Sequence, residues 1–183
     1  MAYLLALSLI LSLGTVNIGR LSAAETADGG KAESVYAGGN GTAESPYLVS
    51  TAAALRAAAE ATNNKGVYYK LTNDIYINGD ETTDWSNFDW DNAAGLNEWF
   101  GRWGLDEANQ FNGNFNGCGY TVYGLYNDWD KNATEIGGTR MALFPVIGAN
   151  AVIKNITING ARLYSNYAAA AIVGQVNREA DPE

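Results

Sequence analysis

The sequence predicts an all-β fold, a solenoid in which short strands wind into a coiled parallel sheet. The stretch at 111–128, FNGNFNGCGYTVYGLYND, places glycines at short intervals among residues that alternate between apolar and polar. Tight corners between short strands require such glycines, and the alternation gives each strand one inward face. The pattern returns at 151–160 and, in weaker form, at 170–176. Similar units that each bury the face of the previous unit form a solenoid.

One α-helix is predicted before the coil. Residues 47–49, Tyr-Leu-Val, follow a glycine-rich turn at 38–41 and indicate a short apolar strand. Ser50 occupies the N-cap position ahead of a run of strong helix formers at 51–62, and the Asn-Asn-Lys-Gly stretch at 63–66 ends the helix. One narrow face of small apolar side chains suits packing against the open end of a sheet stack. That face consists of Leu55, Ala58, Ala59 and Thr62.

After the helix the hydrophobic period changes to that of strands. Residues 67–71 and 75–77 indicate two short strands around a bend. In the glycine-rich stretch that follows, Phe115, Val122 and Leu125 are predicted to point inward, because they alternate with polar residues and glycines.

Length and charge restrict the class of protein. The 183 residues are enough for one domain with a continuous core. Twenty acidic residues against eleven basic ones give a formal charge of −9, so nucleic acids and anionic membrane surfaces would be repelled. The absence of histidine excludes a Ser-His-Asp triad and a histidine-ligated zinc hydrolase. Cys118 is the only cysteine, so an intrachain disulfide is impossible and a small buried thiol is expected.

The N-terminus has the features of an export signal. An apolar run at 3–13 is too short to span a bilayer, and it leads to the small residues Ser22-Ala23-Ala24, which a signal peptidase accepts. We therefore expect residues 1–24 to be a signal peptide and the mature protein to be secreted, or attached to the cell surface without a stable membrane span. Residues 25–37 are predicted to be a disordered spacer, and residues 38–183 the solenoid domain.

The segment at 78–110 does not fit the coil and is predicted to be an insertion. It contains four of the five tryptophans among eight acidic residues. Aromatic rings on a loop can stack on sugar rings while carboxylates accept hydrogen bonds from sugar hydroxyls. The alternative is that most of these rings, above all Trp99 and Trp103, pack the insertion against the wall of the coil. The candidate ligand-binding residues are Trp85, Trp90, Asp89, Asp91, Trp99 and Trp103.

No catalytic residue, metal site or cofactor is predicted. Residues 128–132, Asp-Trp-Asp-Lys-Asn, copy the start of a calcium-binding loop, and Asp89-Trp90-Asp91 copies less of one. Ala133 stands where that loop needs glycine and Thr139 where it needs a bidentate glutamate, so solvated turns are the better interpretation. With twenty acids, some pair of carboxylates at glycosidase spacing arises by chance, so such a pair would not indicate hydrolysis.

Three ordered blocks of the chain resemble a known family. Residues 38–49, GGNGTAESPYLV, precede the predicted helix, while 69–75, YKLTNDI, and 111–122, FNGNFNGCGYTV, follow it. This series resembles the start of secreted bacterial proteins that carry GLUG motifs on a right-handed parallel β-helix with a pectin-lyase-like fold. The resemblance covers roughly residues 38–176 apart from the insertion.

The resemblance implies that the helix at 51–62 caps the N-terminal end of the β-helix and blocks a sheet edge that would otherwise recruit other strands. This chain departs from the pattern at Ala142-Leu143-Phe144-Pro145 and Ala171-Ile172-Val173-Gly174, where such proteins show Gly-Leu-Phe-Gly. No matching cap follows at the other end. We therefore expect the chain to be truncated, with further coils or self-association at its open C-terminal end.

The function predicted from these observations is that of a non-catalytic secreted or cell-surface module for adhesion, with glycans or cell-surface proteins as partners and no nucleic acid. The alternative is the N-terminal part of a β-helix polysaccharide lyase or glycoside hydrolase whose active site lies beyond Glu183. For a lyase, the resemblance calls for a calcium-binding aspartate cluster and an arginine base on middle coils that this sequence lacks. The two alternatives share a fold, so the fold does not separate them.

Overall fold

A computed structural model of the chain describes residues 34–102, 110–128, 140–165 and 167–177. The predicted signal peptide, most of the predicted spacer and Trp103 lie outside these residues. Strands predominate in the described part, with α1 (Ala52–Glu60) as its α-helix. No helix within these ranges is long and apolar enough to cross a membrane.

The strands of the described residues form four sheets, whose neighbouring strands are parallel except for β4 and β7. Sheet 1 has the order β1 (Tyr47–Val49), β2 (Tyr68–Leu71), β5 (Asn114–Asn116) and β9 (Val152–Lys154). Sheet 2 has the order β10 (Thr157–Leu163), β6 (Thr121–Asn127) and β3 (Ile75–Tyr76). Sheet 3 has the order β11 (Ala168–Ala169), β7 (Arg140–Met141) and β4 (Gly101–Arg102), and sheet 4 pairs β12 (Val173–Asn177) with β8 (Phe144–Gly148).

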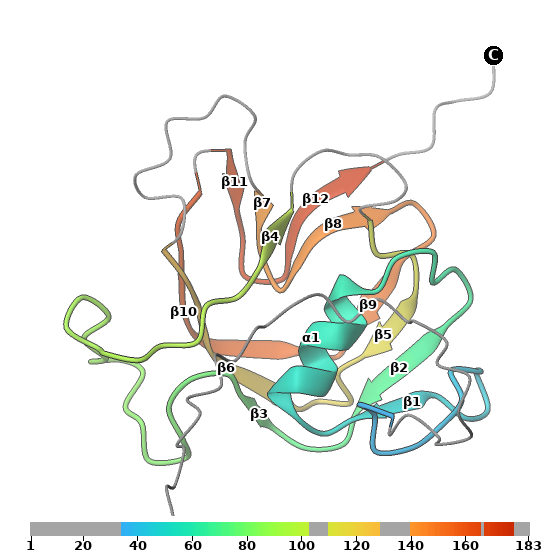
Figure 1. The fold of residues 1–183 in the computed structure, drawn as a ribbon, viewed down its shortest axis with the longest axis horizontal. Coiled ribbons are helices and arrows are strands. Elements are labelled where there is room, and N and C mark those ends of the chain that lie inside the picture. The colour runs from blue at the N-terminus through green and yellow to red at the C-terminus, as the bar shows by residue number, and fades with distance from the viewer. Residues whose placement is uncertain (1–33, 103–109, 129–139, 166, 178–183) are drawn as a thin grey trace, which may run out of the picture. The chain divides into compact units, whose positions relative to one another are not determined.

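The chain visits the four sheets in a fixed order. Strands β5, β6, β7 and β8 lie in sheets 1 to 4 in turn, and β9, β10, β11 and β12 repeat that order (Figure 1). Each later strand pairs in parallel with the strand one passage earlier, so that Ile153 stands beside Phe115 and Ile158 beside Val122. The predictions of an all-β class and of parallel pairing between the patterns at 111–128 and 151–160 are therefore confirmed. The weaker pattern at 170–176 does not stack on either of them, because β12 pairs with β8.

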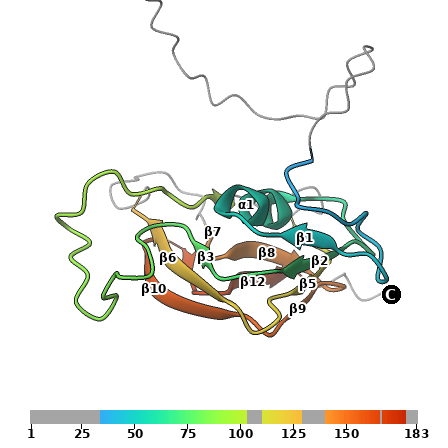
Figure 2. The ribbon, with the colours of Figure 1, turned by 90° about the horizontal axis from the view of Figure 1, so that it is seen from below.

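Helix α1 begins one residue later than the sequence predicts. Thr51, not Ser50, is the N-cap residue, and its hydroxyl accepts a hydrogen bond from the Ala54 amide at 3.1 Å. Leu55 and Ala58 are fully buried on the predicted apolar face. The helix lies at the end of the strand stack opposite to β9 and β10 (Figure 2).

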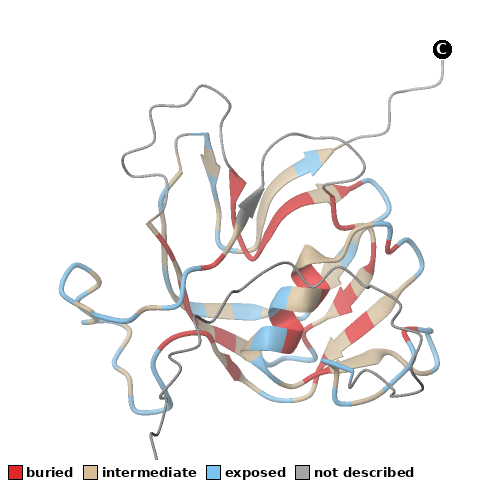
Figure 3. Cartoon of the chain, in the orientation of Figure 1, coloured by how far each residue is buried: buried red, intermediate tan, exposed pale blue. Residues whose placement is uncertain are grey.

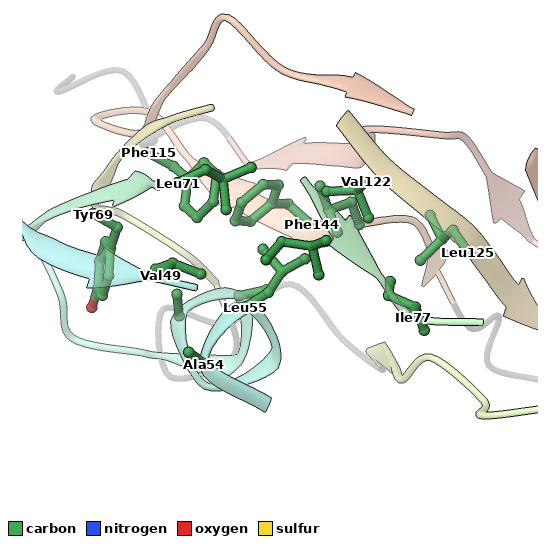
Figure 4. Close-up of a cluster of buried hydrophobic side chains, with 14 of the residues drawn as sticks. Val49, Ala54, Leu55, Tyr69, Leu71, Ile77, Phe115, Val122, Leu125 and Phe144 are labelled. Carbon is green, nitrogen blue, oxygen red and sulfur yellow. The ribbon is translucent and has the colours of Figure 1, made fainter. Parts of the chain in front are cut away.

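The core lies between the sheets and beneath α1. Apolar side chains from strands of sheets 1, 2 and 4 meet the helix there (Figure 4). Burial alternates along β2 and over most of β6, whereas β8 is buried along most of its length (Figure 3). The three inward residues predicted in the glycine-rich stretch, Phe115, Val122 and Leu125, are at most 1% exposed. Aromatic rings extend this core, since Phe144 lies 4.9 Å from Phe111 and 5.1 Å from Phe115 between ring centroids. Alternation along the sequence thus located the core correctly.

Two local expectations need correction. Cys118 is exposed, because it stands in the turn between β5 and β6 with a left-handed φ of 53° and its amide donates to the Asn116 side chain. A turn residue of this kind points away from the core, so the thiol is not buried. Ordered packing also begins before residue 38: the Tyr36 ring stacks on Tyr47 with centroids 4.5 Å apart.

Candidate functional site

The insertion leaves sheet 2 after β3 and rejoins the fold at β4 in sheet 3. In Figure 1 its turns extend beside β6 and β10. Three aspartates order these turns, each accepting the amide of the residue two positions later: Asp80 from Thr82 at 2.9 Å, Asp84 from Ser86 at 3.0 Å and Asp89 from Asp91 at 3.2 Å. Such bonds hold a loop in one conformation without strands.

Trp85 lies flat against the backbone of sheet 2, in a slot that only glycines leave open. A Cβ atom on Gly160 would lie 2.3 Å from Trp85 Cε3, one on Gly124 would lie 2.5 Å from Cη2, and one on Gly79 would lie 2.8 Å from Cζ2. All three are closer than real Cβ contacts come. Gly124 and Gly160 both have a φ of +70°, a conformation that also favours glycine. Sheet 2 therefore carries a seat shaped for one indole.

The remaining rings of the insertion close over Trp85. Phe88 lies 4.9 Å and Trp90 5.6 Å from Trp85 between ring centroids. Trp90 also stacks on Tyr126 of β6, at 5.7 Å and with an interplanar angle of 5°. The Nε1–H of Trp85 is buried with no hydrogen-bond partner in the described residues. Packing, and not hydrogen bonding, therefore holds this side chain.

An ion pair between described residues joins the insertion to β10. Arg162 of β10 donates to the exposed Asp91 carboxylate at 2.7 Å. The bond to Asp91 is the first cause of a raised pKa of the Arg162 guanidinium. Since the aspartate side chain is 73% exposed, the contribution of this pair to stability is small.

The end of the insertion is anchored in the core. Trp99 is 2% exposed, and its Nε1–H donates to the Leu143 carbonyl at 3.1 Å. The Arg56 guanidinium of α1 lies 5.9 Å from the centroid of this indole and donates to the Glu98 carbonyl at 3.0 Å. Trp99 thus joins α1 to the strand stack.

Buried Asn78 fixes the start of the insertion. Its amide nitrogen donates to the carbonyls of Gly124 at 2.7 Å and Asn97 at 3.0 Å, and its oxygen accepts from the Asn97 amide at 2.6 Å. The Asn97 side chain returns a bond to the Ile77 carbonyl at 3.1 Å. The two ends of the insertion are therefore joined at its base.

The structure brings together some of the predicted ligand-binding residues. Trp85, Trp90, Asp89 and Asp91 share the surface over β6 and β10, where the two indoles are partly buried and the two carboxylates are exposed. Trp99 is separated from them and buried, as the packing alternative expects, so its ring is not available to a ligand in this structure. Ligand binding at the other four stays a prediction.

Sequence reasoning missed a second aromatic feature on sheet 2. Tyr76 of β3 and Tyr123 of β6 are register partners, and their rings stack at 4.6 Å with an interplanar angle of 7°. Neither residue stands out in the sequence, because each is one tyrosine in a short strand. The signal that could have found them is the register, since Ile75 and Val122 are matching inward residues of successive units.

Metal binding has no support in the described part of the chain. No group of three or more acidic or cysteine side chains there is placed to hold an ion. Of the calcium-loop match at 128–132, only Asp128 lies within the described residues. The aspartates at 89 and 91 are engaged by neighbouring amides and by Arg162.

The turns of the insertion should loosen in acid. Hydrogen bonds from the hydroxyls of Thr82 and Ser86 lower the pKa values of Asp80 and Asp84 below their ordinary 3.8, and the Asn92 side chain does the same for Asp89. Because the folded-state pKa is lower, this stabilisation is present above about pH 4 and is lost as the pH falls through the folded values. We expect indole fluorescence to shift to longer wavelength in this range, before far-ultraviolet circular dichroism changes.

A Trp85→Phe variant tests whether Trp85 causes the acid-induced shift of fluorescence. The red-shifted component should diminish in this variant, because the ring over sheet 2 is no longer an indole. Asp84→Asn retains an acceptor oxygen but cannot ionise, so it should reduce the acid-dependent change. If fluorescence and circular dichroism changed together at every pH, the insertion would not open separately from the sheets.

Comparison with known proteins adds two relatives and no family. No model of a known protein family matches the chain, and no solved structure matches it. The chain is 33% identical over 127 residues to a protein of Evansella cellulosilytica named "Putative Gly-rich membrane protein", a match that covers 69% of this chain and 12% of that protein. It is 32% identical over 160 residues to the halomucin of Haloquadratum walsbyi, which covers 87% of this chain and 2% of halomucin. The chain thus spans a small part of the length of these curated relatives.

Proposed function

We propose that this chain is a non-catalytic module of a secreted or cell-surface protein and works in adhesion or presentation. The support is that the chain returns to sheets 1 to 4 in the same order, with successive strands paired in register, as a stacking unit of a longer protein would do. Two relatives contain the matched region as a small part of a much longer chain, and one of them is named a membrane protein. Both facts suit a building unit of a long surface protein better than a self-contained enzyme.

The fold proposed for this module is a right-handed parallel β-helix of the GLUG-containing, pectin-lyase-like kind, with α1 as its N-terminal cap. Three fully buried side chains of α1, Ala54, Leu55 and Ala58, face the core, and the helix lies at the end opposite to β9 and β10. A helix in that position would prevent strand addition at one end of the stack. A crystal structure is the direct test, because a left-handed coil or a separate helix would overturn this assignment.

The opposite end is proposed to receive further coils or a second copy of the chain. Among the described strands, β9, β10, β11 and β12 are the last members of sheets 1 to 4. Ile153 and Ile158, whose register partners Phe115 and Val122 are buried, are themselves only partly buried. Light scattering should therefore show concentration-dependent dimers, and replacement of the 53%-exposed Val176 by lysine should reduce them. A monomer at all concentrations would exclude the second copy.

Glycan or protein binding is proposed for the surface that the insertion forms over β6 and β10. The exposed carboxylate of Asp89 lies there beside the partly buried ring of Trp90. Because Trp85 is seated in the glycine slot, its replacement would disturb packing as well as any ligand contact. Asp89→Asn and Trp90→Phe are therefore the informative variants: retention on immobilised glycans should fall while thermal stability is kept.

One experiment separates this function from the enzyme alternative. The purified chain is incubated with polyuronides while ultraviolet absorbance is followed, and is then applied to immobilised glycans and to intact cells. We expect no unsaturated product and measurable retention on cells or glycans. Formation of unsaturated product by this chain would overturn the non-catalytic assignment. Absence of retention on every surface tested would overturn adhesion and leave only a structural role in presentation.

A further inference from the structure

The stacked pair of Tyr76 and Tyr123 lies on the outer side of sheet 2, at its edge. Tyr123 covers one side of the Tyr76 ring, with centroids 4.6 Å apart and planes within 7° of parallel. β3 is the last strand of the sheet in the described residues, so no strand lies against the other side of that ring. The inward neighbours Ile75 and Val122 are 2% and 0% exposed and fix the register of the pair. The ring is therefore held in place at the edge of the sheet, where Tyr76 is partly exposed.

Three carboxylates stand close to β3 in sequence and have no cation of their own among the described residues: Asp74 before the strand, and Asp80 and Glu81 after it. Partial desolvation raises the pKa of the Tyr76 phenol, and Tyr123 together with the negative charges of Asp74, Glu81 and Asp80 raises it further. In the described residues, none of these three carboxylates has an ion pair. Asp74 accepts the Thr121 amide at 2.8 Å, Asp80 accepts from Thr82 and Thr83, and Glu81 is exposed. Three like charges that act on the same phenol produce a local negative potential there.

We propose that the face formed by Tyr76 and Tyr123 binds a basic segment of a partner protein, with an arginine or lysine side chain over the Tyr76 ring and its charge among Asp74, Asp80 and Glu81. A cation over an aromatic face is attracted by the ring quadrupole, and a planar guanidinium can also stack there. This inference rests on the proposed function, since it names the class of partner that the module would hold.

Charge favours a basic protein over a glycan at this place. Stacking of a neutral sugar needs an aromatic ring but not three uncompensated carboxylates, and an acidic glycan would be repelled by them. The whole chain has a formal charge of −9, which also steers basic partners toward it. Of the basic contacts described for the insertion, Arg162 with Asp91 lies on β10, the strand of sheet 2 farthest from β3, and Arg56 of α1 bonds to the Glu98 carbonyl. Neither arginine pairs with Asp74, Asp80 or Glu81.

The test uses a fluorescein-labelled peptide of alternating glycine and arginine, and a glycine–glutamine peptide of equal length as the neutral probe. Fluorescence anisotropy with the whole chain is measured at low and at physiological ionic strength, because exposed charge attraction is screened by salt. We expect Tyr76→Leu and Glu81→Gln each to weaken binding of the arginine peptide by roughly threefold or more. The glutamine peptide should not bind.

Matched variants separate this face from general charge attraction. Glu44→Gln changes the net charge as Glu81→Gln does, but at an exposed turn before β1, and Tyr164→Leu removes a tyrosine that is 47% exposed beyond β10. Both should leave the affinity within about twofold. Equal weakening by Glu44→Gln and Glu81→Gln would show attraction by net charge alone and would overturn the proposal.

Competition distinguishes the remaining outcomes. Cellohexaose, a neutral glycan, is added to the peptide complex and should displace nothing. Displacement that depends on Tyr76 would make this face a glycan site and would overturn the basic-partner assignment while leaving adhesion intact. Failure of the proposed function is distinguished by different measurements, namely retention on cells and formation of unsaturated products. Binding of the arginine peptide does not enter into either of them.

Discussion

Replacement of Trp99 by alanine is expected to cost about 3–5 kcal/mol of the free energy of unfolding. The side chain is 2% exposed in the core cluster, so its loss leaves a large cavity. The Leu143 carbonyl, which now accepts the indole Nε1–H at 3.1 Å, would lose that partner, which adds to the cost. Small domains have a total stability of about 5–15 kcal/mol, so this variant should unfold at a much lower denaturant concentration.

Urea denaturation followed by far-ultraviolet circular dichroism measures this change, because removal of an indole alters the fluorescence baseline. Trp99→Phe keeps most of the ring and should cost clearly less, which guards against a variant that does not fold at all. Trp90→Ala is the matched control in the same insertion, since Trp90 is only partly buried. If Trp90→Ala destabilised the chain as much as Trp99→Ala, the anchoring role assigned to Trp99 would be wrong.

The inward side chains of the strands were predictable because strand geometry is local. Alternate residues of a strand face opposite sides, so Phe115, Val122 and Leu125 could be placed inside from spacing alone. The helix was predictable for the same reason, from the spacing of Leu55 and Ala58. The handedness of the winding and a capping role of the helix could not be predicted in this way, because both depend on how successive passages of the chain are connected in space. Alternation along one strand contains no information about these connections.

The seat of Trp85 could not be predicted from the insertion itself. Its position is decided by glycines at 79, 124 and 160, which lie on three segments far apart in sequence. Pairing of Tyr123 with Asn159 and of Leu125 with Ala161 brings Gly124 and Gly160 side by side. Alignment of the two units TVYGLYN and TINGARL on their shared pattern would have revealed the two glycines at one position, although not the indole that covers them.

The division between packing and binding among the tryptophans was likewise beyond the sequence. Trp85 and Trp99 have similar neighbours along the chain, aromatic and acidic residues, and yet one lies on the outer side of sheet 2 and the other in the core. The depth of each ring depends on where the insertion rejoins the sheets, and β4 in sheet 3 fixes that point. A composition of tryptophans and acids therefore predicts a surface feature but not which ring is free.

Replacement of Gly160 by alanine is expected to cost clearly more than replacement of Gly95, although both glycines have nearly the same φ, +70° and +71°. Each substitution imposes the left-handed backbone penalty of roughly 1–2 kcal/mol. At Gly95 nothing lies within 4 Å of the added Cβ, whereas at Gly160 three Trp85 ring atoms would lie at 2.3, 2.4 and 2.8 Å. The difference between the two variants therefore measures the clash with the indole.

A double-mutant cycle with Trp85→Ala isolates that clash. Without the ring, Gly160→Ala should cost about as much as Gly95→Ala, which corresponds to a coupling free energy of roughly 1–3 kcal/mol between positions 85 and 160. Urea denaturation gives the four stabilities, and the Gly160→Ala variant should also show red-shifted fluorescence as the ring is expelled from its seat. Strict additivity of the two substitutions would mean that Trp85 does not rest on Gly160. The insertion would then be held over sheet 2 by Asp91 and Trp90, and at its ends by Asn78 and Trp99.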